Sequence, residues 1–166
     1  MRKIIHLVLV GMISFLLLGC GSIKPEQNEN LNESKYTKYY TPEVSDGKIT
    51  LEKNCLDNEP IYVNYDDGDV KIQMIAVVAS DSTSRFSLNT CQSCSPSPMA
   101  YFAEENGKLV CQNCGNEFTY DDVGITAGGC NPMNIEHEEN DSQIIISVNT
   151  LNQYEDLFKN WQGSYE

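Results

Sequence analysis

The sequence predicts a small, mainly β (α+β) domain, a sandwich or barrel with two cysteine-bearing loops and a C-terminal amphipathic helix. Segments rich in β-branched and aromatic residues recur along the chain, and turn signals separate them at intervals of about ten residues. Only one stretch, near the C-terminus, has apolar residues at helical spacing. Strands therefore dominate the predicted fold.

The first predicted strands precede the cysteine pairs. Residues 48–53 (KITLEK) alternate between polar and apolar, which is typical of a half-buried strand. Residues 61–65 (IYVNY) are β-branched and aromatic, and the turn signal DDGD follows at 66–69. Residues 70–79 (VKIQMIAVVA) begin with alternation and end as a continuous apolar run. This last pattern indicates a central strand that is buried on both faces at its end.

The later predicted strands carry the cysteines. Residues 85–89 (RFSLN) run as a strand into the pair CQSC, and residues 99–111 form a hairpin that ends at Cys111. The turn of this hairpin is predicted at Asn106-Gly107, because Asn-Gly is the strongest short hairpin signal. Residues 143–148 (QIIISV) are the last predicted strand.

One amphipathic helix is predicted after that strand. Asn149 and Thr150 are suitable N-cap residues, and apolar or aromatic residues follow at steps of three and four. The residues expected on this apolar face are Leu151, Tyr154, Leu157, Phe158 and Trp161.

Residues 1–19 predict an export signal. Two basic residues precede an apolar run at 4–18, and a helix of this length spans only about 22 Å of a roughly 30 Å hydrocarbon core. The sequence Leu17-Leu18-Gly19-Cys20 resembles the bacterial lipoprotein cleavage box, in which the cysteine becomes the lipid-modified first residue. Cys20 is thus the predicted lipidation site, and the protein is expected on the extracytoplasmic face of the cell membrane. The alternative is an ordinary secreted protein with a chance cysteine.

After the anchor, residues 20–45 are predicted to be a flexible tether, and residues 46–166 a cysteine-rich domain. The tether is rich in Asn, Glu, Ser and Lys, although tyrosines near its end could pack on the domain. Removal of Arg2 and Lys3 with the signal changes the formal net charge from −13 to −15. So acidic a chain argues against nucleic acid as a partner and against electrostatic adhesion to anionic lipid.

Apart from Cys20, the mature chain has six cysteines, and their spacing favours metal binding. Two C-x-x-C pairs, Cys91/Cys94 and Cys111/Cys114, are separated by sixteen residues, the pattern of a tetrahedral thiolate site. Gly115 suits such a turn because the residue after the second ligand often needs a positive φ, whereas Ser95 takes that position in the first pair. Structural disulfides and an exchange-active dithiol are the alternatives.

A fifth thiol, Cys130, lies in the glycine-built turn GGCNP and is a candidate ligand, either for a centre with several metal atoms or in place of one of the four. A buried free cysteine is the alternative. Cys55 is expected to be a lone cysteine, and His137 to lie in an exposed acidic loop. Met99 and Met133 lie near the cysteines and could be soft ligands for copper, but gap-filling is expected of them.

The motifs NTCQSC, LVCQNCG-x-x-F and GGCNP resemble the FtrD-like membrane iron–sulfur protein family over roughly residues 46–160. This family is associated with the cell envelope and, in some members, with iron-transport systems. The resemblance implies that the cluster or metal ligands are Cys91, Cys94, Cys111, Cys114 and Cys130. The sequence departs from the family at 82–84, where a Gly-containing turn is usual, and its lipid-anchored form differs from relatives with many membrane spans.

A second resemblance concerns architecture. The order of strands, cysteine loops and hairpin is similar to that of Rieske domains, whose two loops present Cys-x-His and Cys-x-x-His to a two-iron cluster. Here cysteines take the place of those histidines, and His137 lies outside both loops. An all-thiolate cluster has a lower potential than a His-ligated one.

The sequence therefore predicts a membrane-anchored protein that binds an iron–sulfur cluster or metal ion through clustered cysteines, in electron transfer or iron uptake. A membrane redox or metal-transport complex is the expected partner. A structural zinc adaptor and a thiol–disulfide oxidoreductase are the alternatives. No catalytic residue is predicted, because neither a nucleophile elbow nor a histidine near a plausible nucleophile is present.

Overall fold

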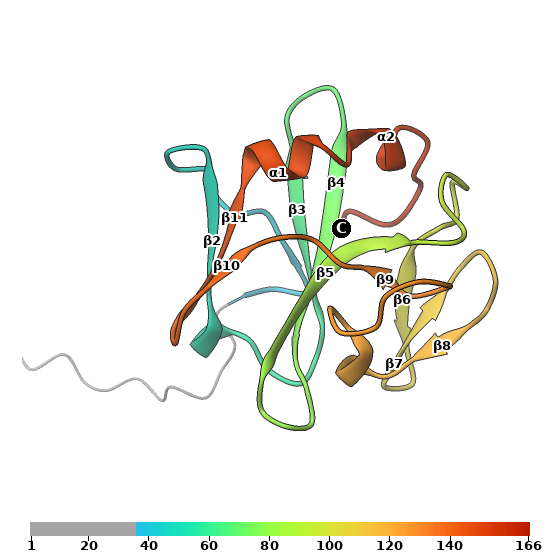
Figure 1. Cartoon of the computed structure of the whole chain (residues 1–166), viewed down its shortest axis with the longest axis horizontal. Coiled ribbons are helices and arrows are strands. Elements are labelled where there is room, and N and C mark those ends of the chain that lie inside the picture. Colours follow the sequence, from blue (N-terminus) through green and yellow to red (C-terminus); the bar gives the residue numbers. More distant parts are fainter. Residues whose placement is uncertain (1–35) are drawn as a thin grey trace, which may run out of the picture.

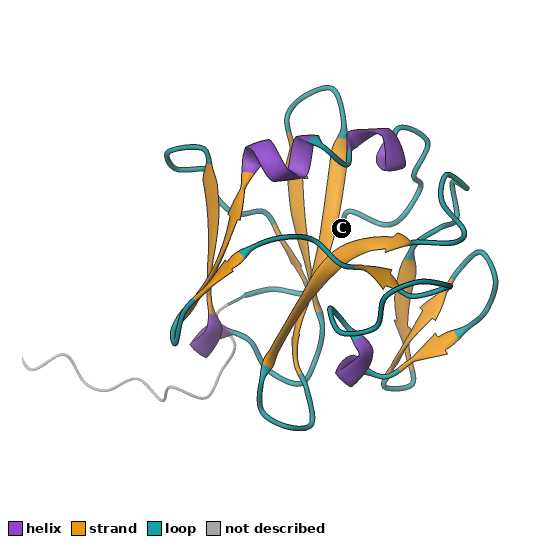
Figure 2. Cartoon of the chain, viewed as in Figure 1, coloured by secondary structure: helices purple, strands orange, loops and turns teal. Residues whose placement is uncertain are grey.

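A computed structural model describes residues 36–166, so the predicted signal peptide and Cys20 lie outside the described residues (Figure 1). The described fold is mainly β, with 37% strand and 11% helix, which confirms the predicted fold class. Figure 2 shows that strands make up most of the regular structure and that the helices are short. No barrel closes among the described residues, whose strands form three sheets. The Rieske-like architecture stays a prediction.

The central sheet has the strand order β1-β3-β4-β5-β9. Its long strands are β3 (Ile61–Asp66), β4 (Lys71–Val78) and β5 (Ser84–Cys91), which pair antiparallel in succession. Two short strands flank them, β1 (Tyr39–Tyr40), parallel to β3, and β9 (Pro132–Met133), antiparallel to β5. Since β1 lies within the predicted tether, the tyrosine-rich end of that segment packs on the domain.

Two smaller sheets lie on opposite sides of the central strands (Figure 1). One consists of β10 (Glu138–Glu139), β11 (Gln143–Ser147) and β2 (Lys48–Glu52). The other is the predicted hairpin extended by one strand, with β6 (Phe102–Glu105), β7 (Lys108–Cys111) and β8 (Glu117–Phe118). Asn106 and Gly107 both have positive φ, as an Asn-Gly hairpin turn requires. Single 3₁₀ turns lie at Lys53–Cys55 and Tyr120–Asp122.

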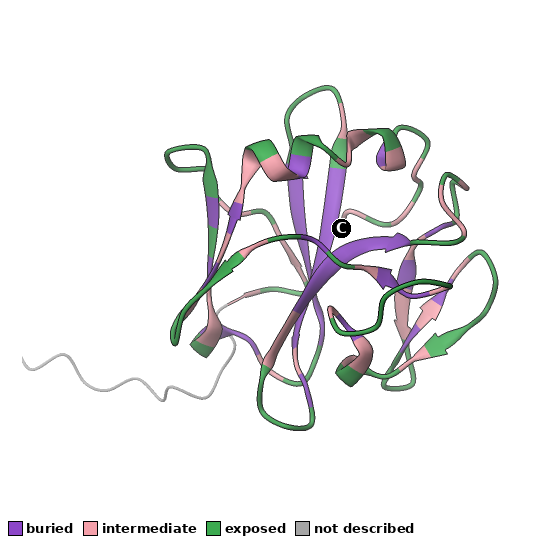
Figure 3. Cartoon of the chain, in the orientation of Figure 1, coloured by how far each residue is buried: buried purple, intermediate pink, exposed green. Residues whose placement is uncertain are grey.

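The central strands are buried on both faces because each face packs on a separate core (Figure 3). Along β4, Ile72 and Met74 face a first core shared with β2 and β11, whereas Ile75 and Val77 face a second core shared with β6 and β7. This division follows from the alternation of side chains along a strand. The predicted double burial of this strand is confirmed.

The predicted C-terminal helix is divided in the structure into α1 (Val148–Asn152) and α2 (Glu155–Phe158). The N–H of Gln153 bonds to the carbonyl of Thr150, and the N–H of Tyr154 to that of Leu151, so the helix tightens to three-residue spacing and ends. The apolar face is nevertheless buried as expected, since Leu151 and Phe158 belong to the first core. The apolar face of the predicted helix is thus preserved in the tertiary packing, although the helix itself is interrupted.

Buried amides join the central sheet to the cysteine-bearing hairpin and to the C-terminal segment. Asn64, Gln73 and Asn89 lie on adjacent strands, and Gln73 Nε2 donates to Asn64 Oδ1 at 2.8 Å while Asn89 Nδ2 donates to Gln73 Oε1 at 2.7 Å. Asn89 Oδ1 then accepts from the N–H of Phe102 at 2.8 Å, and Asn64 Nδ2 donates to the carbonyl of Tyr165 at 3.0 Å. This amide ladder fixes the hairpin on the central sheet.

Candidate metal centre

The first cysteine of each pair is the last residue of a strand. Cys91 ends β5 and Cys111 ends β7, and both side chains are fully buried in the second core. Each strand therefore delivers its cysteine to the same end of that core, and the second cysteine of each pair lies on the loop that follows. On β7, Leu109 and Cys111 face the second core at alternate positions. On β5, Phe86 and Leu88 face the first core, and Cys91 faces the second because it lies an odd number of residues after them, at a register shift of the strand.

Each pair closes a tight turn. The N–H of Ser95 bonds to the carbonyl of Cys91 at 2.9 Å, and the N–H of Gly115 bonds to the carbonyl of Cys111 at 2.8 Å. Gly115 has a φ of +75°, which confirms the prediction, whereas Ser95 makes the same bond without a positive φ. Backbone N–H groups also point at the sulfur atoms, from Cys94 toward Cys91 and from Cys114 toward Cys111. These donors stabilise negative charge on a thiolate.

Cys130 is brought to the pairs by β9, because Pro132 lies opposite Cys91 in the sheet. The side chain of Asn131 is 1% exposed, and its Nδ2 donates to the carbonyl of Thr126 at 2.7 Å and to that of Pro132 at 2.9 Å. The carbonyl of Asn131 accepts from the N–H of Gln92 at 3.2 Å. The GGCNP turn is thereby attached to the first cysteine turn.

The five predicted thiols meet at one place. The sulfur atoms of Cys91, Cys94, Cys111 and Cys130 all lie within 4.8 Å of one another. Cys130 Sγ is 3.2 Å from Cys91 Sγ and 3.0 Å from the Sγ of the exposed Cys114. None of the six cysteines that the structure describes is in a disulfide.

These separations suit one metal ion. Four sulfurs at about 2.3 Å from a tetrahedral ion lie roughly 3.8 Å apart. Cys94 Sγ and Cys111 Sγ are 3.9 Å apart, and the whole quartet fits within 4.8 Å. A cluster with several iron atoms distributes its cysteine ligands over different irons and so separates their sulfurs further.

The pKa values of the thiols diverge because their surroundings differ. Burial raises the pKa of Cys111 to about 12 and also raises those of Cys94 and Cys130. Burial acts in the same direction on Cys91, but hydrogen bonds from the Cys130 and Cys94 thiols bring its pKa below the ordinary value. A hydrogen bond from Cys130 lowers the pKa of Cys114 to about 7. Binding of a metal therefore has to displace protons from the buried thiols, and its affinity rises with pH.

The remaining candidates lie elsewhere. Cys55 is buried at the end of the 3₁₀ turn 53–55 and is not in the thiol group. Met133 packs against the first core, and Met99 is 39% exposed. His137 packs edge-on against Phe86, and its Nδ1 lies 2.9 Å from the carbonyl of Ile135.

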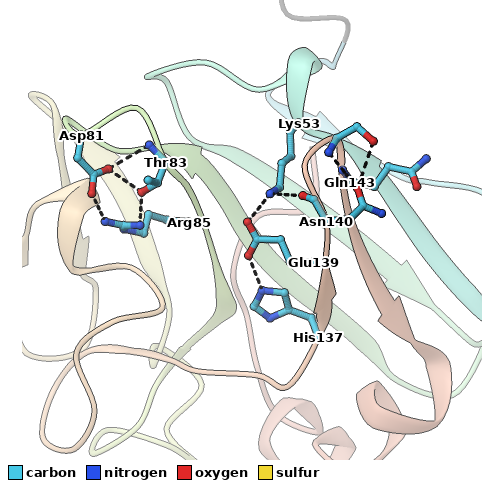
Figure 4. Close-up of polar contacts among 9 residues, drawn as sticks. Lys53, Asp81, Thr83, Arg85, His137, Glu139, Asn140 and Gln143 are labelled. Atoms are coloured by element: carbon cyan, nitrogen blue, oxygen red, sulfur yellow. Dashed lines mark hydrogen bonds and ion pairs between the residues drawn. The ribbon is translucent and has the colours of Figure 1, made fainter.

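Figure 4 places His137 in a polar network of the sheet that contains β10. Its Nε2 is 3.7 Å from a carboxylate oxygen of Glu139, which also pairs with Lys53. Lys53 in turn donates to the carbonyl of Asn140. These contacts account for both ring nitrogens of His137 without a metal.

Two polar residues that support the thiols were missed from sequence. Gln92 accepts from the N–H of Gly128 through Oε1 at 2.9 Å, and Asn113 accepts from the Ser97 hydroxyl at 2.6 Å. The first contact joins the first cysteine turn to the Cys130 turn, and the second joins the two pairs. For Gln92, the available signal was a glutamine directly after the first cysteine of both pairs, whereas no comparable signal marked Asn113.

A family model described as "Membrane iron-sulfur containing protein FtrD-like" matches residues 55–158, a range that holds both cysteine pairs and Cys130. The chain belongs to the FtrD-like family. The predicted resemblance to this family is therefore confirmed, and with it the assignment to membrane iron–sulfur or metal-binding proteins. No curated protein and no solved structure matches this FtrD-like chain significantly. Among residues 36–166, no helix has the length and apolar character needed to cross a membrane.

Proposed function

We propose that this FtrD-like protein is an extracytoplasmic lipoprotein, anchored at Cys20, whose clustered thiols bind iron for electron transfer or iron uptake. The observation that carries the proposal is the group of four cysteine sulfurs within 4.8 Å of one another. The donors suit the metal, since thiolates are the usual ligands of iron–sulfur centres. The family assignment supports iron over other thiophilic metals.

The four clustered cysteines differ in their burial and therefore in their roles at the site. Cys91 and Cys111 would hold a metal from within the second core, where the surrounding apolar side chains exclude water. Cys94 and Cys130 are half-buried, and so the outer side of the site lies close to solvent. Thiolate-bound iron supplies one-electron redox chemistry.

The decisive experiment is anaerobic purification of the full chain in detergent, with metal analysis, a sulfide assay and a visible spectrum. A coloured protein with stoichiometric iron is expected, and the absence of acid-labile sulfide would support a single ion. Replacement of the buried ligand Cys111→Ser should remove the colour, whereas the control Cys55→Ala should retain it, because Cys55 is outside the thiol group. A metal-free chain with its cysteines oxidised would overturn the proposal.

A structural zinc module is the second candidate, because the size of the thiol cage suits zinc as well as iron. Zinc gives a colourless protein, so the same purification separates the two metals. If the protein contains stoichiometric zinc after growth in medium with ample iron, the adaptor function is supported and the redox function is rejected.

Membrane attachment requires a separate test, because Cys20 lies outside the described residues. The full chain should partition with the membrane fraction and incorporate labelled fatty acid, and the variant Cys20→Ala should do neither. Labelling that persists in the variant would contradict the lipid anchor.

A further inference from the structure

Five thiols meet at a site where a tetrahedral ion takes four. The pair spacing selects one set of four thiols and the sulfur distances select another, and both sets contain Cys91, Cys94 and Cys111. The pair spacing selects Cys114 as the fourth ligand, and the mutual sulfur distances select Cys130. The structure therefore presents two candidates for one coordination position.

The two candidates are direct neighbours. Cys114 Sγ and Cys130 Sγ are 3.0 Å apart, and the Cys114 thiol also hydrogen-bonds with those of Cys111 and Cys94. Cys114 is exposed, whereas Cys130 is half-buried beside Cys91. Cys114 lies outside the quartet of mutually close sulfurs, so an exchange requires its sulfur to move inward as that of Cys130 moves outward.

The turn that carries Cys130 has room to make this shift. Gly128 and Gly129 have φ values of +82° and +80°, and a Cβ added at either would meet no atom within 4 Å. By contrast, the segment 124–131, which contains this turn, is fixed at both ends. A Cβ at Gly124 would lie 2.5 Å from the carbonyl oxygen of Phe86, and the side chain of Asn131 is buried. Gly128 is also held, because its N–H donates to Gln92 Oε1 at 2.9 Å, and movement is thus confined to Gly129 and Cys130.

We propose that Cys114 and Cys130 alternate as the fourth ligand of one metal ion, and that exchange through Cys114 is the route by which the metal enters and leaves. The proposal rests on the proposed function and adds a mechanism of metal exchange to it. In the exchange, a metal–sulfur bond to Cys114 forms as the bond to Cys130 breaks. The Cys114 thiol proton passes to the released Cys130 sulfur, so that neither the charge nor the oxidation state of the site changes.

The test uses cobalt(II) as the probe, bound to the reduced full chain in detergent under anaerobic conditions. Its thiolate charge-transfer band reports how many sulfurs coordinate, and its transfer to EDTA reports the exchange rate. The variants are Cys114→Ser, Cys130→Ser and the double variant, with Cys55→Ala as control. Each single variant should bind one cobalt with a four-thiolate band, and the double variant should show the weaker band of three thiolates.

The rate of cobalt transfer to EDTA distinguishes alternation of Cys114 and Cys130 from a fixed set of four ligands. Cys114→Ser should transfer cobalt to EDTA about tenfold more slowly than the wild type, because the entering sulfur is gone. A wild-type rate in Cys114→Ser, or loss of its four-thiolate band, would overturn the proposal. The Cys114→Ser result carries the test even where Cys130→Ser fails to fold, since Cys114 is exposed. Failure of the wild type to bind cobalt at all would instead reject the proposed metal function itself.

Discussion

At the scale of single residues, Gly115 couples backbone conformation to the position of a ligand. Its φ of +75° lets its N–H close the turn onto Cys111 while Cys114 projects toward Cys130. No side chain opposes a Cβ at this position, so the requirement for glycine is conformational and not steric.

Replacement of Gly115 by alanine is expected to destabilise the domain by about 1–2 kcal/mol, the cost of a left-handed conformation for an ordinary residue. It should also weaken metal binding, because relaxation of the turn moves a sulfur. The matched control is Gly68→Ala, which has a φ of +96° in a turn far along the chain from the thiols. Chemical denaturation and cobalt titration measure the two effects. Equal loss of affinity in both variants would contradict a local role for Gly115.

At the scale of elements, the amide ladder on β3, β4 and β5 positions the cysteine-bearing hairpin. Asn89 serves both neighbours, since its Oδ1 accepts from the N–H of Phe102 and its Nδ2 donates to Gln73. Its backbone carbonyl also accepts from Trp161 Nε1 at 2.9 Å. One side chain therefore holds the hairpin against the sheet only two residues before Cys91.

Replacement of Asn89 by alanine should lower the free energy of unfolding by about 2–3 kcal/mol, because it leaves the buried N–H of Phe102 and the carbonyl oxygen of the Gln73 amide without partners. Urea denaturation of the metal-free protein measures this loss. The exposed Asn160→Ala is the control, for which a change within about 0.5 kcal/mol is expected. A small effect at Asn89 would show that apolar packing alone holds the hairpin.

The strands and the hairpin could be predicted from sequence because their signals are local. Alternation defined residues 48–53, and Asn106-Gly107 defined the hairpin turn. The amide ladder could not be predicted, since Gln73 and Asn89 look like ordinary polar positions until the strands are placed side by side. The interruption of the helix at 153–154 could not be predicted either, because the apolar spacing continues through it up to Trp161. Likewise, spacing grouped the two pairs but could not bring Cys130 to them, because β9 pairs with a strand forty residues earlier in the chain.

At the scale of the whole molecule, the buried Tyr62 and the half-buried Tyr165 connect distant parts of the chain. Tyr62 is 3% exposed, and its hydroxyl accepts from the N–H of Glu104 on the hairpin. The Tyr165 hydroxyl donates to the carbonyls of Tyr65 and Ile72. Burial raises the pKa of both phenols, since the anion would lose its hydration.

The raised pKa values predict an alkaline limit of stability. Both tyrosines stay protonated in the folded protein while their unfolded counterparts lose a proton near pH 10. The free energy of unfolding should therefore be independent of these groups below about pH 9 and fall with increasing pH above about pH 10. Denaturation across this range measures the slope. The variant Tyr165→Phe should reduce the slope by close to one proton, whatever its effect on absolute stability, and an unchanged slope would contradict the assignment.

The attachment of Tyr165 to Asn64 also bears on the order in which the chain can fold. The amide ladder begins at Asn64 on β3, and Asn64 donates to the carbonyl of Tyr165, 101 residues later in the chain. A growing chain can form the hairpin turn early, but it cannot complete the ladder until residue 165 is free to join. We expect the thiols to remain accessible to metal donors until that contact has formed.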